Sequence, residues 1–243
     1  MATQTRMVEV RTKILKENDR IARELRRQFQ EAGVFVVSLV SSPGSGKTAF
    51  LEATLRSLRE RFRAAAVVGD LATENDAQRL ARAGVPIKQI TTGTVCHLEA
   101  EMVRQSIAEW NLAKLDYLFI ENVGNLVCPS SYDLGEQLRA VLFSVTEGED
   151  KPLKYPTIFN TADIAIITKI DLAAAVEFDR NAAYKNIEAV RPGMHILEVS
   201  SKTGNGTSDW FELLRSQRDD ALHATKSPFV GTDIPTSAIG AAL

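Results

Sequence analysis

The chain has 243 residues, with 29 Lys and Arg against 31 Asp and Glu, and a formal net charge of −2. This balance excludes a protein that binds nucleic acid through bulk positive charge. Apolar residues make up 44% and charged residues 25%, which excludes a disordered chain and is typical of a soluble globular domain. With two cysteines, no secretory signal and no apolar stretch long enough to span a bilayer, we expect a cytoplasmic protein that contacts no membrane.

The N-terminal segment, residues 8–31, has the periodicity of an amphipathic helix. Apolar residues recur at steps of four and seven, with Arg, Lys and Glu between them: Val10, Ile14, Ile21, Leu25 and Phe29. We expect residues 1–33 to form a helix that lies against the following domain. The alternative is a helix that docks a partner protein.

Short apolar runs follow, separated by stretches with helical periodicity. The run at 34–40 (VFVVSLV) is typical of a strand buried on both faces. Further runs lie at 64–68, 117–120, 141–145, 164–167 and 196–199, with helical patterns at 48–62, 76–83 and 98–112. This alternation predicts an α/β fold over residues 34–222, with a mainly parallel sheet and helices on both faces. Residues 223–243 have no clear periodicity and are predicted to be a flexible tail.

The segment 41–48 (SSPGSGKT) joins the first strand to a helix and fits a phosphate-binding loop. Gly46, Lys47 and Thr48 match the P-loop pattern, whereas Ser41 replaces its first glycine. Small residues let backbone N–H groups curl around phosphates, and the helix adds its positive end. Lys47 is expected to reach the β and γ phosphates and Thr48 to bind Mg²⁺. The predicted nucleotide contacts are Pro43, Gly44, Ser45, Gly46, Lys47, Thr48 and Ala49.

Two acidic residues stand at predicted strand ends. Glu121 precedes Gly124 by three residues, as in the GTPase element that holds the Mg²⁺ shell and senses the γ-phosphate through the glycine amide. Asp70 ends the second strand and is predicted to hold Mg²⁺ through water or to orient the attacking water. With Lys47, these acids are the predicted catalytic residues. The alternative for each is a carboxylate that caps a loop or helix.

The segment 168–171 (TKID) is close to the Asn-Lys-x-Asp element with which GTPases select their base. The Asp171 carboxylate can accept hydrogen bonds from N1 and N2 of guanine together, which adenine cannot match. Thr168 replaces the usual Asn and is expected to loosen this loop. Lys169 is a further predicted base contact, and Ser201 and Lys202 occupy the place of the element that meets guanine O6. These elements favour GTP over ATP.

Cys96 and His97 are adjacent, and Cys128 lies shortly after Gly124. Thiolate and imidazole ligands suit zinc or nickel. A structural zinc site usually has four ligands and the chain offers three, so the partner subunit of a symmetric dimer or water would complete the shell. The alternative is that both cysteines are small core residues and His97 caps a helix.

Six segments, in this order, resemble the HypB family, the GTPase accessory proteins of nickel insertion into [NiFe]-hydrogenase: SSPGSGKT, GDLATENDA, TTGTVCHLEA, ENVGNLVCPSSYDLGE, SVTEGEDKPLKYP and TKIDL. The resemblance runs from the N-terminal helix to about Leu214. ENVGNLVCP and EGEDKPLKYP carry it most specifically. The related urease accessory GTPase UreG is less similar, because it has a Cys-Pro-His metal motif instead.

The resemblance implies a slow, homodimerising GTPase that carries nickel and uses GTP and Mg²⁺. The implied phosphate and Mg²⁺ contacts are Lys47, Thr48, Asp70 and Glu121. The implied base contacts are Lys169 and Asp171. The implied nickel or zinc site, at a nucleotide-dependent dimer interface, consists of Cys96, His97 and Cys128. A HypA-like nickel accessory protein and the hydrogenase large subunit are the implied partners.

The chain departs from the family at some positions. Residues 1–33 contain no Cys or His, so the N-terminal nickel storage of some members is not expected, and Glu99 stands where the family usually has Asp. Lys151 or Lys154 is a candidate for extra positive charge near the phosphates. Three other functions stay open: a GTP-gated binding module with structural cysteines, a small-molecule kinase, and a nickel-insertion GTPase that serves another metalloenzyme.

Overall fold

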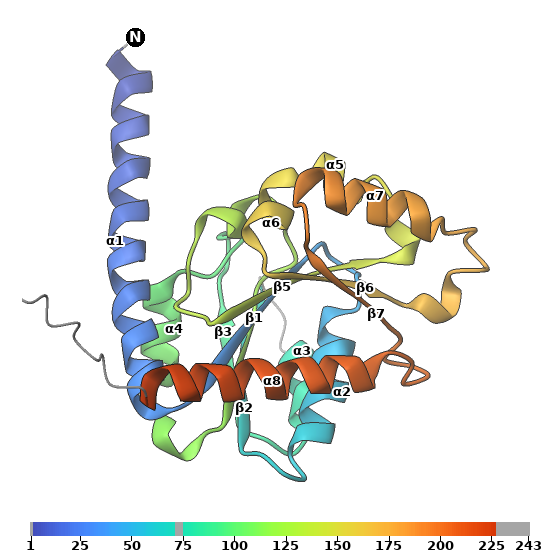
Figure 1. Cartoon of the computed structure of the whole chain (residues 1–243). Helices are drawn as coiled ribbons and strands as arrows, with labels where there is room; N and C mark the ends of the chain where they lie inside the picture. Colours follow the sequence, from blue (N-terminus) through green and yellow to red (C-terminus); the bar gives the residue numbers. More distant parts are fainter. Residues whose placement is uncertain (1, 71–74, 227–243) are drawn as a thin grey trace, which may run out of the picture.

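The computed structural model describes residues 2–70 and 75–226, and a parallel sheet of seven strands forms its centre (Figure 1). The strands are β1 (Phe35–Ser41), β2 (Ala64–Asp70), β3 (Ile87–Thr91), β4 (Tyr117–Glu121), β5 (Leu138–Ser144), β6 (Ile164–Thr168) and β7 (His195–Val199). Their order across the sheet is β3-β2-β4-β1-β5-β6-β7. β1 pairs with β4 and β5, with Phe35 opposite Tyr117 and Val37 opposite Leu138. The predicted α/β fold with a parallel sheet is confirmed.

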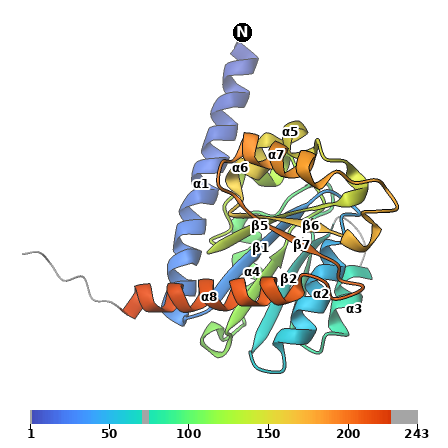
Figure 2. The ribbon, with the colours of Figure 1, turned by 45° about the vertical axis from the view of Figure 1, so that its right-hand side comes forward.

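Helices cover both faces of the sheet (Figure 2). They are α1 (Ala2–Ala32), α2 (Lys47–Leu58), α3 (Asn75–Ala81), α4 (Ala100–Ile107), α5 (Lys151–Lys154), α6 (Pro156–Thr161), α7 (Arg180–Val190) and α8 (Thr207–Lys226), with 3-10 turns η1 (Leu112–Lys114), η2 (Cys128–Ser131), η3 (Val145–Glu147) and η4 (Ile170–Leu172). Helices α2, α3 and α8 share one apolar cluster with the sheet. Helices α1, α4, α6 and α7 contribute to the clusters on the opposite face.

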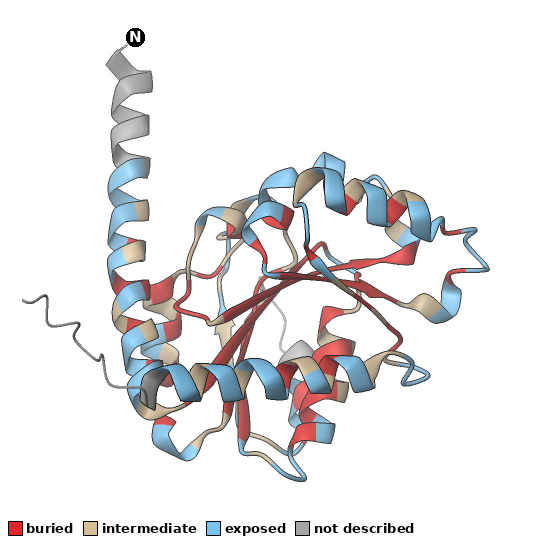
Figure 3. Ribbon diagram, viewed as in Figure 1, coloured by how far each residue is buried: buried red, intermediate tan, exposed pale blue. Residues whose placement is uncertain are grey.

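The strand β1 is buried along its whole length (Figure 3) and contributes side chains to the apolar clusters on both faces of the sheet. Phe35, Val37 and Leu39 point into the cluster beneath α2 and α8, whereas Val36 and Val40 point to the other face. Successive side chains of a strand alternate between faces, so a strand covered on both sides reads as an unbroken apolar run. The carboxyl end of β1 is thereby fixed in the middle of the sheet, where the phosphate loop begins.

The N-terminal helix is confirmed, and its C-terminal half packs on α4. Ile21, Leu25 and Phe29 are buried in the cluster shared with α4, as the periodicity predicts. Ile14 is 46% exposed, and the side chain of Val10 lies outside the described part of the chain. The apolar stripe is therefore in contact with the domain over only part of the helix.

Two elements differ from the predicted pattern. Strand β3 was not expected, because it lies at the sheet edge and its residues are half-buried or exposed, so IKQIT shows no apolar run. Helix α8 continues to Lys226, so the first residues of the predicted tail are helical, and the rest of that tail (227–243) lies outside the described residues. Within the described part of the chain, no helix is both long and apolar enough to cross a membrane.

Candidate nucleotide and metal sites

The loop between β1 and α2 has the backbone geometry of a phosphate loop. Gly44 has φ +76° and Gly46 has φ +93°, which are left-handed conformations that favour glycine. Gly46 is the residue before α2, so the first N–H groups of that helix open onto the loop. Such N–H groups have no partner within the helix, and the helix dipole adds positive potential. The loop can therefore hold an anion by its backbone.

Lys47 and Thr48 both approach Glu121 at the end of β4. The Thr48 hydroxyl donates to Glu121 Oε1 at 2.7 Å, and Lys47 Nζ lies 3.4 Å from the same oxygen. Glu121 is 1% exposed and Lys47 is 8% exposed, so their charges interact in a poorly solvated place. This arrangement brings a cation, a hydroxyl and a carboxylate together at the start of α2.

A pocket of about 530 Å³ lies beside this group, at the carboxyl ends of the strands. Its walls include residues 42–48 of the phosphate loop together with Asp70, Arg79 and Lys169: the lining residues are Ser42, Pro43, Gly44, Ser45, Gly46, Lys47, Thr48, Ala49, Asp70, Arg79, Val123, Gly124 and Lys169. Arg79 was not predicted, because DAQRL carries no signal beyond an exposed helix. The arginine is held by Glu52, whose carboxylate accepts from its Nε at 2.8 Å.

The end of β6 supports the same loop from the side. The Thr168 hydroxyl donates to the carbonyl oxygen of Ser45, and Lys169 Nζ donates to that of Gly44 at 2.7 Å. Lys169 itself has a left-handed backbone, with φ +58°. Thr168, expected to loosen this region, instead ties β6 to the phosphate loop.

The remaining predicted base contacts lie further along. Asp171, in η4, accepts a hydrogen bond from the Ser200 hydroxyl at 2.6 Å, which joins the ends of β6 and β7. Ser201 and Lys202 follow β7 directly, next to Ser200. Asp171, Ser201 and Lys202 do not line the pocket that contains the phosphate loop. They follow the ends of β6 and β7, beyond the residues that line the pocket.

Of the two lysines in EGEDKPLKYP, Lys151 is the one linked to the phosphate loop. Glu147 accepts from the Ser42 hydroxyl and lies 3.0 Å from Lys151 Nζ. Lys154 is instead paired with Asp150 at 2.6 Å on the exposed side of α5. The carboxylate of Glu147 thus connects this segment to the loop.

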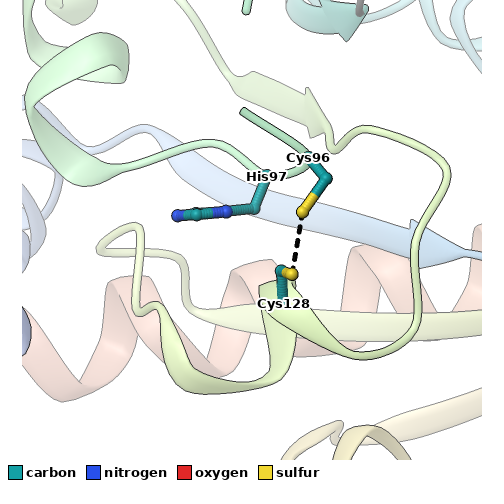
Figure 4. Close-up of side chains that lie close together, drawn as sticks. All are labelled: Cys96, His97 and Cys128. Atoms are coloured by element: carbon teal, nitrogen blue, oxygen red, sulfur yellow. Dashed lines mark hydrogen bonds between the residues drawn. The ribbon is translucent and has the colours of Figure 1, made fainter. Parts of the chain in front are cut away.

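Cys96, His97 and Cys128 come together at one point (Figure 4). The two sulfurs lie 2.8 Å apart, and the three ligand atoms lie within 4.8 Å of one another. All three residues are half-buried, and the cysteines form no disulfide. Two soft thiols and one imidazole are a donor set that suits nickel or zinc.

His97 is held beside the sulfurs by its neighbours. Its ring lies against that of Tyr132, with centroids 4.0 Å apart and planes tilted by 34°, and Nε2 lies 3.4 Å from Glu99 Oε1. Burial lowers the pKa of His97 below its ordinary value, although the Glu99 carboxylate partly opposes this effect. The ring is therefore favoured in the neutral form, which is the form that binds metal ions.

The loop that follows β4 touches both sites. Gly124 packs against the phosphate loop, where an added Cβ would lie 3.1 Å from the Cα of Pro43. Asn122 Oδ1 accepts from the N–H groups of Leu98 at 3.0 Å and Val123 at 2.9 Å. Asn125 Nδ2 donates to the carbonyl oxygen of Cys96 at 3.3 Å. The segment 121–128 therefore joins the carboxylate beside the phosphate loop to the paired cysteines.

Comparison with known proteins identifies the domain. Residues 35–198 match the family model of the CobW/HypB/UreG nucleotide-binding domain. The chain is 44% identical to the hydrogenase maturation factor HypB of Azotobacter vinelandii, over 91% of this chain and 73% of that protein. It is 42% identical to the hydrogenase/urease maturation factor HypB of Helicobacter pylori, over 90% of this chain and 92% of that protein.

Solved structures agree with these matches. The crystal structure of Helicobacter pylori HypB in complex with nickel has a TM-score of 0.79 at 42% identity and covers 84% of this chain and 96% of that one. HypB from Archaeoglobus fulgidus has a TM-score of 0.78 at 37% identity, over 84% of this chain and 99% of that one. The chain belongs to the CobW/HypB/UreG family of nucleotide-binding proteins and, within it, to the HypB hydrogenase maturation factors.

Proposed function

We propose that this protein is a GTP-hydrolysing metallochaperone, which helps to insert nickel into [NiFe]-hydrogenase in the cytoplasm. In this proposal, two chains associate when GTP is bound, and hydrolysis releases the nickel. A HypA-like accessory protein and the hydrogenase large subunit are the proposed partners. The names of its relatives, which are hydrogenase maturation factors, support this assignment.

The nucleotide chemistry is supported by the groups around the phosphate loop. Thr48, Asp70 and Glu121 offer the hard oxygen donors that Mg²⁺ prefers, and Lys47 adds a cation for the phosphates. Mg²⁺, when bound, would neutralise charge that develops on the transferred phosphoryl group. Phosphoryl transfer depends mainly on positioning and electrostatics, so a slow hydrolase does not require a strong general base.

Selection of guanine is assigned to Lys169, in the wall of the pocket, and to the residues beyond it. Asp171 would accept from the guanine edge, Lys169 would lie along the base, and Ser201 and Lys202 would approach its O6. The Ser200 hydroxyl orients the Asp171 carboxylate at 2.6 Å, which supports a fixed acceptor at this place.

Nickel is the proposed cargo of Cys96, His97 and Cys128. Three donors within 4.8 Å of one another leave further coordination positions for water or for a second copy of the chain. A symmetric dimer would bring two such sets together, which supports dimerisation as part of the cycle.

One observation carries the proposal: segment 121–128 contacts both the phosphate loop and the paired cysteines. It begins at Glu121, beside Lys47 and Thr48, and ends at Cys128, whose sulfur lies 2.8 Å from that of Cys96. A change in phosphate charge at one end therefore bears on the position of a metal ligand at the other.

A second function, a GTP-gated binding module with structural cysteines, has one observation in its favour. The Cys96 thiol donates a hydrogen bond to the Cys128 sulfur at 2.8 Å, a contact that two structural cysteines would also make. Such a site would bind nickel weakly and with the same affinity in every nucleotide state.

Calorimetric titration of Ni²⁺ separates the two functions. The full chain would be loaded with GDP or with a non-hydrolysable GTP analogue, and compared with Cys128→Ala and with Ser130→Ala. Ser130 is in the same turn as Cys128, but its exposed hydroxyl donates only to the carbonyl oxygen of Val127, so it is the matched control.

We expect Cys128→Ala to weaken nickel binding by more than about 100-fold, beyond the effect typical of an outer-shell residue. Ser130→Ala should bind like the wild type, and the wild-type affinity should change with the nucleotide. Equal nickel affinity in both nucleotide states, or no nickel binding at all, would contradict the metallochaperone and favour the binding module.

A further inference from the structure

Asn18, in the buried half of α1, makes two hydrogen bonds that connect the two cysteine segments. Its Nδ2 donates to the carbonyl oxygen of Asp133 at 2.9 Å, and its Oδ1 accepts from the N–H of Ala100 at 2.8 Å. Asn18 is 5% exposed, so water competes little for either bond. Asp133 follows Cys128 in one segment, and Ala100 follows His97 in the other. One side chain therefore spans both segments.

The hydrogen bond from Ala100 to Asn18 pairs a backbone N–H that the residues next to Ala100 in sequence do not pair. Ala100 is the first residue of α4, and the side chain of the preceding Glu99 makes no capping hydrogen bond. The first N–H groups of a helix have no partner within that helix, and an unpaired buried donor is unfavourable. Asn18 thus supplies, from another helix, the oxygen that the residue before a helix usually provides.

The segment that carries Cys128 is also seated directly on α1. Gly135 has φ +83°, and a Cβ added there would lie 2.9 Å from the carbonyl oxygen of Ala22 and from Leu25 Cβ. Arg26 donates to Asp133 Oδ1 at 2.6 Å. Close backbone contact and an ion pair therefore fix this segment to the same helix surface that holds the start of α4.

We propose that Asn18 is a positioning residue for the metal site, and that α1 is therefore part of the support that keeps Cys96 and Cys128 together. The part of this proposal that concerns nickel rests on the function proposed above. Without the Asn18 amide, the Asp133 segment and the start of α4 lose the bridge that joins them. The thiols then separate, and the donor set opens.

Two variants of the full chain test this role. Asn18→Ala removes both bonds, and Asn18→Asp keeps an oxygen for Ala100 but removes the donor to Asp133. Thr54→Val is the matched control, because it removes another buried inter-helix hydrogen bond, from Trp210 Nε1 at 3.0 Å, that is unrelated to the cysteines. The GDP affinity of all variants shows whether the nucleotide site is intact.

The first readout needs no metal. Diamide oxidises a close thiol pair to a disulfide and takes up the two hydrogen atoms, so the rate of Cys96–Cys128 crosslinking reports how often the sulfurs meet. We expect crosslinking to slow by about tenfold or more in both Asn18 variants, since proximity sets this rate. Thr54→Val should crosslink at the wild-type rate.

The second readout is Ni²⁺ affinity together with the thiolate-to-nickel absorbance band. Both Asn18 variants should bind nickel about 10- to 100-fold more weakly, which is the range for residues that orient metal ligands, with an altered band and unchanged GDP affinity. Wild-type crosslinking in the Asn18 variants, or equal slowing in Thr54→Val, would overturn the positioning role. If the wild type binds no nickel but crosslinks fast, and the Asn18 variants crosslink slowly, the metallochaperone is refuted while the role of Asn18 stands.

Discussion

Segment 121–128 contacts both the phosphate loop and the cysteine pair, yet different parts of the chain hold these two sites. Hydrogen bonds from Thr168 and Lys169, at the end of β6, fix the phosphate loop. The cysteine segments depend on α1, through Asn18 and Arg26. The two sites meet at segment 121–128. Because the supports differ, a substitution can impair nucleotide binding without impairing metal binding, or the reverse. The coupling between the two sites can then be tested with substitutions in segment 121–128.

The largest expected effect separates the nucleotide site from the metal site. Lys47→Ala removes the cation of the phosphate loop, so GTP hydrolysis should fall by at least about 100-fold, as when one transition-state donor is lost. Nickel affinity of the nucleotide-free chain should stay within about twofold of the wild type, because the contact of Lys47 with segment 121–128 is at Glu121, seven residues before Cys128. Hydrolysis assays and nickel titration measure the two effects. Lys185→Ala, an exposed lysine on α7, is the control, and loss of nickel binding in Lys47→Ala would break the comparison.

The next effect concerns the base that the nucleotide site selects. Asp171→Ala should reduce the preference for GTP over ATP by about 100-fold or more, because a site built around a hydrogen bond rejects a ligand that lacks it. Ser200→Ala, which keeps the carboxylate but removes its 2.6 Å partner, should lose less. Competition between the two nucleotides gives the ratio. An unchanged ratio in Asp171→Ala would mean that this aspartate does not read the base.

A third change is aimed at the junction between the sites. The Cβ introduced by Gly124→Ala would lie 3.1 Å from the Cα and N of Pro43, so the two loops must move apart by a few tenths of an ångström. We expect nickel affinity to lose its dependence on the nucleotide, with GTP bound about tenfold more weakly. Nickel titrations in the GDP and GTP-analogue states measure this dependence. Gly193→Ala is the control: Gly193 has φ +75°, so an alanine strains its own turn, but the added methyl meets nothing within 4 Å, and full coupling should remain there. Full coupling in Gly124→Ala would place the junction elsewhere.

The smallest expected effect is on the pH dependence of stability. Burial opposes ionisation of Asp133, but hydrogen bonds from Arg26 and the Gly135 amide outweigh it and lower its pKa. Because the folded pKa lies below the unfolded value of about 3.9, the stabilisation is present above that pH and lost as the pH falls through the folded pKa. Asp133→Asn should therefore lower the free energy of unfolding at pH 7 by about 1 kcal/mol.

Denaturant unfolding between pH 7 and pH 2 measures this effect. The wild type should lose stability more steeply than Asp133→Asn below about pH 4, since the variant has no proton to bind at this position. Asp150→Asn, whose exposed partner is Lys154, is the control and should be nearly neutral at pH 7. If the free energy of unfolding falls equally steeply with pH in the wild type and in Asp133→Asn below about pH 4, the ion pair with Arg26 does not anchor the segment.

Much of the fold and of the phosphate loop could be predicted because their signals are local. VFVVSLV followed by SSPGSGKT specifies a buried strand and a phosphate loop within fifteen residues. The role of Asn18 could not be predicted, because its partners lie 115 and 82 residues away in sequence and an asparagine in a helix carries no mark of them. Asn122 was part of a recognised motif, but its contact with Leu98 depends on how two loops meet in space. The edge strand β3 could not be predicted either, because a half-exposed strand shows no apolar run.

The position of β1 in the sheet has a consequence for synthesis of the chain. β1 pairs with β4 and β5, and its first residue, Phe35, is opposite Tyr117, so the strand emerges from the ribosome long before either neighbour exists. At about 5 to 20 residues per second, the delay is roughly 4 to 16 s. During that time an apolar, uncharged strand has both edges open, which is the condition under which nascent chains associate wrongly. The strand that carries the phosphate loop is therefore the part of the molecule for which protection during translation matters most.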